Sequence, residues 1–271
     1  MGLRINTNTS ALNAARILRG TTKQLNSSLQ RLASGLRINS ARDDAAGLAI
    51  AETFRSQVIG ANVAQRNAQD GVSLMQTAEG ALSETTNILQ RIRELAVQSA
   101  NGVYTDTNRA ALNNEVAQLL EQIDDIALDT NFNGLRVLSS AQTVTLQTGA
   151  QNGESLAVVV TGAKTNDLRV TAVSVSSMAA ANNTLDTIDS ALNSVTALRA
   201  TMGAFQNRLE FTINSLAIQE ENAAASESAI RDADIARETI DFTRNQILVS
   251  SGTSVLAQAN LVPQTALTLL G

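Results

Sequence analysis

Between residues 11 and 36 the chain repeats apolar side chains at alternating steps of four and three residues. The positions of this seam are Ala11, Ala15, Leu18, Thr22, Leu25, Leu29, Leu32 and Leu36. Such spacing places every member on one stripe of a helix. A lone helix that exposes its apolar stripe is marginally stable in water. The segment is therefore predicted to be a helix that requires a partner helix.

The charges at the two ends of the chain indicate which partner that is. Residues 1–42 carry seven positive side chains and no acid, whereas residues 210–241 carry eight acids and two arginines. Opposite charges beside apolar seams determine partner and orientation in coiled coils. We expect the two terminal helices to pair, which gives a rod with both chain ends at one pole. That architecture is typical of an assembly subunit.

The interior of the chain also reads as helix, which makes the predicted fold class mainly α. A second helix is expected over about residues 43–100, with apolar residues seven positions apart (Phe54, Ala61, Ala68, Met75, Leu82, Leu89 and Ala96). Further seams run through residues 112–126 and 185–216. The one proline, Pro263, leaves residues 1–262 free of this helix breaker. We predict a long antiparallel coiled-coil rod with a small β-hairpin region.

A glycine-punctuated stretch interrupts this helical pattern. Residues 143–148, 155–161 and 168–175 alternate or are rich in β-branched residues, which predicts a small β-hairpin insert. The preceding segment Asp129–Gly134 matches the first half of a calcium-binding loop. Its twelfth position is Ser140 where a glutamate is needed. A polar turn is therefore favoured over a metal site.

Composition excludes several classes of function. The chain has neither cysteine nor histidine, which removes thiol chemistry, the commonest general base and the commonest zinc ligand. A pI of about 4.9 argues against nucleic acid as a partner. The sequence has no run of 18 apolar residues, so no membrane-spanning segment is predicted. We therefore expect no enzyme, no cofactor and no metal. The acid-free N-terminal segment formally fits a transit peptide, but its heptads are needed in the mature protein.

Residues 245–271 contain no charged side chain, although leucine, valine and isoleucine alternate there with serine, threonine, glutamine and asparagine. Such a segment is too apolar for an exposed helix and too polar for a membrane. We expect it to be buried among other copies of the chain.

Two motifs show a resemblance to the bacterial flagellin family. Residues 31–50, RLASGLRINSARDDAAGLAI, resemble the amino-terminal signature of the family, and residues 252–260, GTSVLAQAN, resemble its carboxy-terminal signature. The resemblance implies a subunit of the helical flagellar filament. Residues 1–42 with 230–271 would form its inner core, and residues 43–139 with 179–229 a helical rod domain. Residues 140–178 would be a short β-rich variable insert.

The resemblance and the seams together suggest an assembly interface. Its candidate residues are Leu18, Leu25, Leu29, Leu32, Leu36, Leu248, Val255, Leu256 and Leu261. The family is exported unfolded through the flagellar secretion channel to an extracellular filament. Implied partners are further copies of the chain, an export chaperone with the secretion apparatus, and the filament cap and hook-associated proteins. A hook–filament junction adaptor is the alternative function, since it shares the helical termini.

The resemblance further implies recognition by a Toll-like innate receptor. The matching positions are Gln90, Arg91, Leu95, Gln98 and Glu115. All five carry the residue types of recognised flagellins. The competing interpretation is that the same surface packs neighbouring subunits, so that these residues serve assembly alone.

Overall fold

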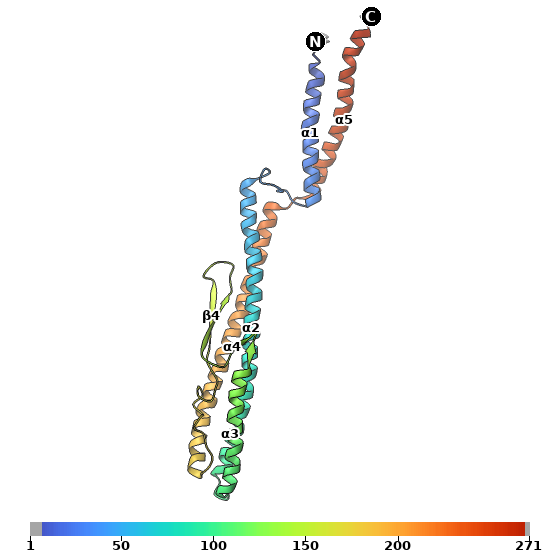
Figure 1. Cartoon of the computed structure of the whole chain (residues 1–271). Coiled ribbons are helices and arrows are strands. Elements are labelled where there is room, and N and C mark those ends of the chain that lie inside the picture. The colour runs from blue at the N-terminus through green and yellow to red at the C-terminus, as the bar shows by residue number, and fades with distance from the viewer. Residues whose placement is uncertain (1–6, 269–271) are drawn as a thin grey trace. The chain divides into compact units, whose positions relative to one another are not determined.

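The computed structural model describes residues 7–268, with side chains to residue 261, and over this range the fold is mainly α. Five helices are present in that range: α1 (Thr9–Ser34), α2 (Ala45–Ala100), α3 (Asp106–Asp129), α4 (Met178–Arg231) and α5 (Ile235–Thr268) (Figure 1). Two short antiparallel hairpins lie between α3 and α4. The predicted fold class is confirmed. Within the described residues no helix is long and apolar enough to cross a membrane.

The chain divides into two compact units. The first comprises Met1–Ser56 and Asn222–Gly271, and the second comprises Gln57–Glu221. Helices α2 and α4 each contribute to both units. The first unit includes more residues than the inner-core domain expected from the resemblance, residues 1–42 with 230–271. That inner-core domain stays a prediction.

In the first unit, α1 and α5 pair in antiparallel orientation. At one end Asn8 Nδ2 donates to the carbonyl of Ala259 at 2.7 Å, and at the other Arg31 lies 3.7 Å from Glu238. The Asn8 side chain also caps α1 by accepting from the Ala11 amide. The helix ends at Gly35, whose φ of 72° is the left-handed conformation that glycine adopts readily. The predicted pairing of the terminal helices is confirmed.

The segment from Gly35 to Asp44 turns back against the end of α4. Its backbone pairs with that of residues 231–233, where the Arg37 amide donates to the Arg231 carbonyl at 2.7 Å and the Ala233 amide donates to the Gly35 carbonyl at 2.9 Å. Leu36 forms an isolated bridge with Asp232. Leu36 therefore lies outside the helix, and the predicted seam is wrong at its last position because Gly35 has already turned the chain.

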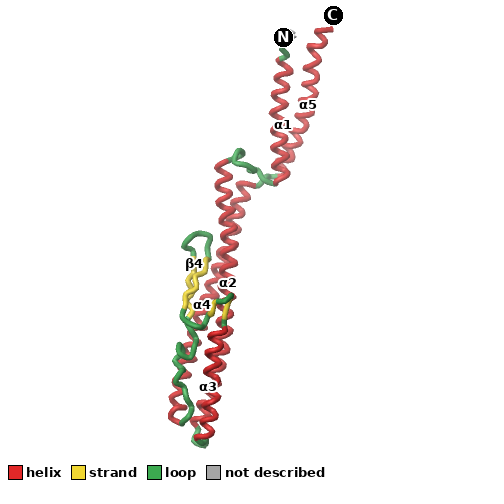
Figure 2. Tube along the Cα trace, viewed as in Figure 1, coloured by secondary structure: helices red, strands yellow, loops and turns green. Residues whose placement is uncertain are grey.

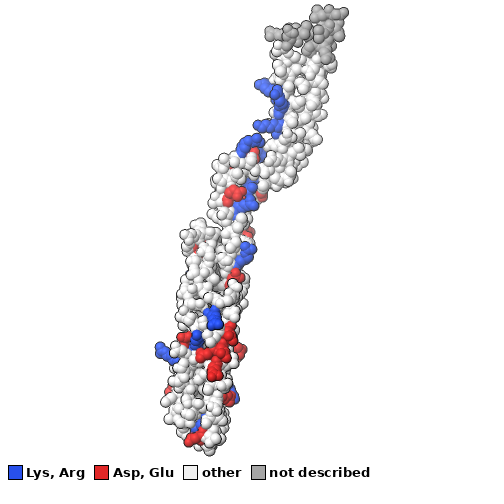
Figure 3. Space-filling model, in the orientation of Figure 1, with Lys and Arg blue, Asp and Glu red and all other residues white. Residues whose placement is uncertain are grey.

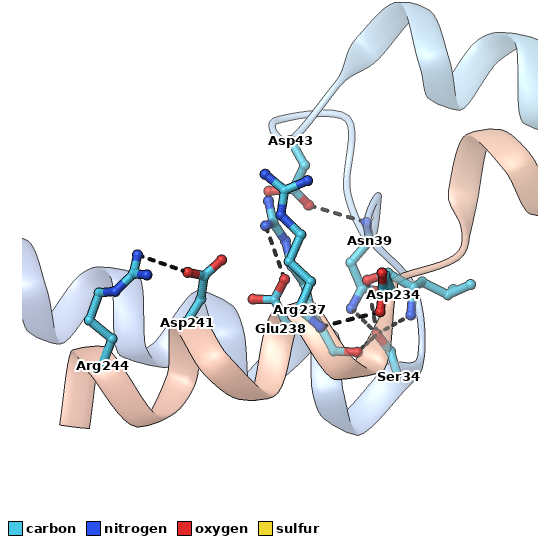
Figure 4. Close-up of polar contacts among 10 residues, drawn as sticks. Ser34, Asn39, Asp43, Asp234, Arg237, Glu238, Asp241 and Arg244 are labelled. Atoms are coloured by element: carbon cyan, nitrogen blue, oxygen red, sulfur yellow. Dashed lines mark hydrogen bonds and ion pairs between the residues drawn. The ribbon is translucent and has the colours of Figure 1, made fainter. Parts of the chain in front are cut away.

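Two adjacent aspartates organise the start of α2, and Figure 4 shows the first of them, Asp43, bonded to Asn39. The Asp43 carboxylate accepts from the amides of Asn39 and Ser40 and from the Ser40 hydroxyl. These bonds, the Ser40 hydroxyl first, lower the pKa of Asp43. Asp44 is the helix cap, accepting from the Gly47 amide at 2.8 Å. Asn39 and Ser40 close a turn onto Asp43 just before the helix.

In the second unit, α2 and α4 pack through residues seven positions apart. On α2 the buried set is Ala61, Ala68, Met75, Leu82, Leu89 and Ala96, and on α4 it is Ile188, Val195, Met202, Leu209 and Leu216. Polar contacts fix the antiparallel alignment, with Gln65 Nε2 donating to Glu220 and Arg93 Nε donating to Asp189, each at 2.7 Å. The heptad pattern predicted for α2 is confirmed over residues 61–96, whereas Phe54, in the first unit, is only partly buried.

A tight hairpin follows α3. Strands β1 (Asn131–Phe132) and β2 (Leu135–Arg136) are joined by Asn133 and Gly134, which both have positive φ. A two-residue turn of this kind matches the twist of the paired strands. The segment is thus the predicted polar turn. Among the described residues no group of three or more His, Cys, Asp or Glu side chains is placed to hold a metal ion.

The second hairpin lies beside the helices of the second unit (Figure 2), and its Leu156, Val158 and Val160 belong to the same buried core. Strands β3 (Gln142–Gln147) and β4 (Ser155–Val160) pair in register, with Val144 opposite Val158, as expected for residues 143–148 and 155–161. Leu146 packs over Gly71 of α2, where an added Cβ would come within 2.4 Å of the leucine Cδ1. The glycine therefore permits the close docking of the hairpin on α2.

Residues 168–175 form turns, not the third strand that their β-branched residues suggested. Their backbone and that of the preceding loop bond to α3 side chains: the Asp124 carboxylate accepts from the Thr165 amide, and Asn113 Oδ1 accepts from the Val175 amide. These contacts satisfy the polar backbone without a strand partner. Leu168, Val170 and Val175 are buried in the same core as the helices.

Candidate assembly surfaces

The contact between α1 and α5 is lined by small and polar residues. Its most buried members are Thr21 and Ser28 on α1 with Glu238 and Asn245 on α5. Gly252 faces Leu18, whose Cδ1 lies 3.2 Å from where a Cβ would stand. Small residues at a seam let two helix backbones approach closely, so the pair can form without burying its largest side chains.

This arrangement corrects the predicted α1 seam at two positions, Thr22 and Leu29. Leu18, Leu25 and Leu32 are partly buried against α5, as expected. Leu29 is 47% exposed, and Thr22 is exposed as well. The buried positions are instead the residues one step earlier, Ser28 and Thr21. The prediction assumed that every large apolar residue of the seam faces the partner within the same chain, and Leu29 does not.

Phe242, Val249 and Leu256 of α5 are partly buried, whereas α1 leaves several other large apolar residues of this helix uncovered. They are Ile240, Ile247, Leu248, Val255 and Leu261, each about half exposed or more. A shallow groove of about 450 Å³ lies among Ile240, Ile247 and Leu248 and the neighbouring Thr239, Thr243 and Arg244. Burying one such side chain contributes roughly 1.5–3 kcal/mol. Contiguous exposed apolar surface of this kind marks an interaction site.

Charge complementarity operates at one end of the pair only. In the described part of the chain, Arg31–Glu238 is the single ion pair between α1 and α5. Positive side chains gather along α1 while the neighbouring face of α5 is uncharged (Figure 3). Arg16, Arg19 and Lys23 lie along the part of α1 that faces the charge-free stretch of α5. The opposite charges at the termini therefore fix the base of the pair and do not extend along it.

A second candidate surface lies on α2 and α3 in the second unit. Arg91 donates to Glu94 at 2.9 Å and to Glu115 at 3.0 and 3.1 Å. The bonds to Glu94 and then to Glu115 raise the pKa of Arg91. Gln98 Nε2 donates to the Tyr104 hydroxyl at 2.8 Å. This network holds exposed side chains of two helices in a fixed arrangement.

The five candidate receptor residues do not share one surface. Gln90, Arg91, Gln98 and Glu115 are exposed, and Arg91 and Glu115 contact one another. Leu95 is 1% exposed and belongs to the buried core of the second unit. Its side chain cannot contact a partner unless the helices separate, so the expectation that Leu95 lies on the receptor surface is wrong for the chain in this fold.

These features define a class of protein: a helical structural subunit whose terminal helix pair presents uncovered apolar faces. Two family models match the sequence. Residues 5–143 match the bacterial flagellin N-terminal helical region, and residues 185–270 match the bacterial flagellin C-terminal helical region. The chain belongs to the bacterial flagellin family. It is accordingly a structural subunit of the flagellar filament and not an enzyme.

Relatives match over nearly the full length. The flagellin of Halalkalibacterium halodurans is 46% identical over 269 residues, covering 98% of this chain and 99% of the relative. The flagellar filament 31.3 kDa core protein of Treponema maltophilum is 44% identical over 283 residues, with the same coverage. A putative flagellar hook-associated protein from Vibrio parahaemolyticus, whose solved structure is 13% identical, matches with a TM-score of 0.58 over 70% of this chain and 100% of that chain. At that identity the likeness extends to the fold alone.

Proposed function

We propose that copies of this chain join into a filament through the uncovered apolar face of the α1–α5 pair. The observation that carries the proposal is that α1 leaves Ile247, Leu248 and Val255 of α5 about half exposed or more. Of the candidate interface residues, Leu29, Leu248, Val255 and Leu261 are exposed and would contact neighbouring copies. Leu18, Leu25, Leu32, Leu36 and Leu256 are partly buried within their own unit and would support that surface.

The charge-free C-terminal part of α5 is suited to a contact between copies. Between residues 245 and 261 the α5 surface presents serine, threonine, glutamine and asparagine beside its apolar residues. When such a surface is buried, neutral polar groups can form hydrogen bonds between copies, whereas charges would need ionic partners. Identical copies carry identical charges, so a neutral contact surface also avoids repulsion between them.

Seeded growth tests the proposal. Purified monomer is mixed with sheared filament fragments and followed by sedimentation and negative-stain imaging, beside a chain that lacks residues 1–42 and 245–271. The full chain is expected to form long filaments and the truncated chain none. Short caps or no growth from the full chain would contradict the proposal and favour the junction adaptor. The full-length relatives named as filament core proteins or flagellins favour the filament.

Export and the remaining partners rest on the family resemblance. We infer that the chain passes unfolded through the flagellar secretion channel to the cell exterior, with an export chaperone, the secretion apparatus, the cap and hook-associated proteins as partners. The absence of cysteine supports this route, because no disulfide has to be opened for threading or closed afterwards.

We also propose recognition of the monomer by a Toll-like innate receptor, through Gln90, Arg91, Gln98 and Glu115. The supporting observation is the network that holds Arg91 between Glu94 and Glu115, since a pre-positioned arginine loses little freedom on binding. Arg91→Ala is expected to weaken receptor binding about tenfold or more, as removal of an interface arginine commonly does.

The measurement is the receptor dissociation constant of purified monomers, with Arg93→Ala as the matched control. Arg93 is also exposed and ion-paired on α2, but its partner is Asp189 of α4. Equal affinity of the Arg91→Ala monomer and the unaltered chain would leave assembly as the role of this surface.

A further inference from the structure

We propose that Asn152, in the β3–β4 loop, is a site of spontaneous deamidation, at which water converts the asparagine into aspartate and isoaspartate. Three asparagines of the chain directly precede a glycine: Asn101, Asn133 and Asn152. The structure holds the first two in place and leaves the third free to react. The reaction needs no filament, so it goes beyond the proposed function and is tested without polymerisation.

The reaction joins the backbone nitrogen of Gly153 to the side chain of Asn152. The nitrogen, after giving its proton to hydroxide, attacks Cγ of Asn152. The new C–N bond closes a five-membered succinimide ring, and the bond from Cγ to Nδ2 breaks and releases ammonia. Water then opens the ring at either carbonyl, which gives aspartate or isoaspartate. One water is taken up, one ammonia is released and nothing is oxidised. Glycine favours the attack because it has no Cβ to obstruct it or to restrict rotation.

Exposure to water does not distinguish the three sites. Each asparagine and the glycine after it are exposed. What differs is how firmly the peptide between them is held. The ring closes only when this peptide rotates to bring the glycine nitrogen onto Cγ of the asparagine, so hydrogen bonds that fix the pair slow the reaction.

Asn101 is held through its side chain and both of its backbone groups. Its Oδ1 accepts from the Val103 amide at 3.2 Å, and its own amide donates to the Gln98 carbonyl at 3.2 Å. Its carbonyl accepts from Nη2 of Arg109 at 3.2 Å. Arg109 is 5% exposed, so this donor is itself fixed by the fold. Ring closure at Asn101 requires several of these bonds to break together.

Asn133 is held by the hairpin that it closes. Asn133 and Gly134 have φ of 50° and 82° and form the whole turn between the directly paired Phe132 and Leu135. Phe132 packs against the buried core of the second unit. Rotation of the Asn133–Gly134 peptide would therefore separate the two strands and move a core residue.

Asn152 lies in a longer loop whose bonds bypass it. Among the described residues neither Asn152 nor Gly153 makes a hydrogen bond. The loop is closed by Gln151 and Glu154, which are both exposed. The Glu154 amide donates to the Gln151 carbonyl at a long 3.3 Å, and the flexible Glu154 side chain accepts from the Gln151 amide at 2.9 Å. Gly153 has open space around it. The Asn152–Gly153 peptide can thus rotate while β3 and β4 stay paired.

The product differs from the unaltered chain in charge and in backbone. It carries a new carboxylate two residues from Glu154, which makes the net charge of −5 one unit more negative. Isoaspartate also adds one carbon to the backbone of the loop. Because water is the only reactant, the converted fraction grows with the age of the molecule.

Peptide mapping of the full-length monomer tests the site. Trypsin cleaves after Arg93, Arg109, Arg136 and Lys164, which puts the three asparagines on separate peptides, residues 94–109, 110–136 and 137–164. The folded monomer is incubated at mildly alkaline pH and the conversion of each peptide is followed by mass spectrometry. We expect Asn152 to react about tenfold faster than Asn101 or Asn133, which corresponds to a barrier lower by about 1.4 kcal/mol.

Two controls separate the fold from the local sequence. In urea the three asparagines should react at similar rates, because each precedes glycine. Asn152→Gln should remove the acidic species that isoelectric focusing detects in the aged chain, since glutamine would have to close a less favourable six-membered ring. Asn101→Gln should leave that species in place. Equal rates in the folded monomer, the same order of rates in urea, or an acidic species that persists in Asn152→Gln would each overturn the assignment.

Discussion

Leu248→Glu is expected to abolish filament growth at concentrations where the unaltered chain polymerises, while the monomer keeps its fold. Leu248 is 48% exposed on the side of α5 that α1 does not cover. In the monomer the new carboxylate stays in water and costs little. Between copies it would be buried beside Arg244, which already pairs with Asp241, and a buried charge without its own partner costs several kcal/mol. Each 1.4 kcal/mol is tenfold in affinity, so the critical concentration should rise at least a hundredfold.

Leu248→Met is the matched control because it conserves volume and apolar character, changes that folded cores tolerate well. It should assemble at nearly the concentration of the unaltered chain. Circular dichroism of both monomers checks the fold, and sedimentation after seeding gives the critical concentration. Normal filaments from Leu248→Glu would show that this face of α5 stays solvated in the filament. The lack of charged side chains in residues 245–271 would then need another explanation.

Heptad spacing alone predicted much of the fold. The recurrence of Met75, Leu82 and Leu89 marks the buried side of α2, because residues seven apart lie on one side of a helix whatever covers them. The Asn133-Gly134 turn was predictable as well, because asparagine and glycine adopt positive φ more readily than other residues. These features depend on the chain near them and not on which partner is present.

The burial of individual residues was not predictable, because spacing cannot say which of two apolar stripes meets a partner in the same chain. On α1 the larger residue Leu29 is exposed and its small neighbour Ser28 is buried. A filament subunit must keep apolar surface for other copies, so the rule that the largest apolar side chain faces inward fails there. Similarly, residues 168–175 have the composition of a strand, but their amides form local turn bonds and, at Val175, a bond to Asn113 of α3.

Leu95, at the candidate receptor surface, is another residue whose burial the spacing did not predict. Its substitution is the second change for which we expect a large effect, here on the free energy of unfolding. Leu95→Ala is expected to lower the free energy of unfolding of the second unit by about 2–5 kcal/mol, since it removes a buried side chain and leaves a cavity. Gln90→Ala, on the exposed side of the same helix, should change it by no more than about 0.5 kcal/mol. Urea unfolding followed by circular dichroism measures both.

This difference decides how a receptor experiment is interpreted. If Leu95→Ala weakens receptor binding, the loss of affinity can be explained by the destabilised second unit. If Arg91→Ala weakens binding while the monomer stays stable, the loss of affinity reports the contact that Arg91 makes with the receptor. Leu95→Met, which fills most of the same space, should cost less than about 1.5 kcal/mol and restore binding. An unfolding midpoint of Leu95→Ala equal to that of the unaltered chain would mean that Leu95 is exposed in solution. The receptor surface would then include it, as the family resemblance implied.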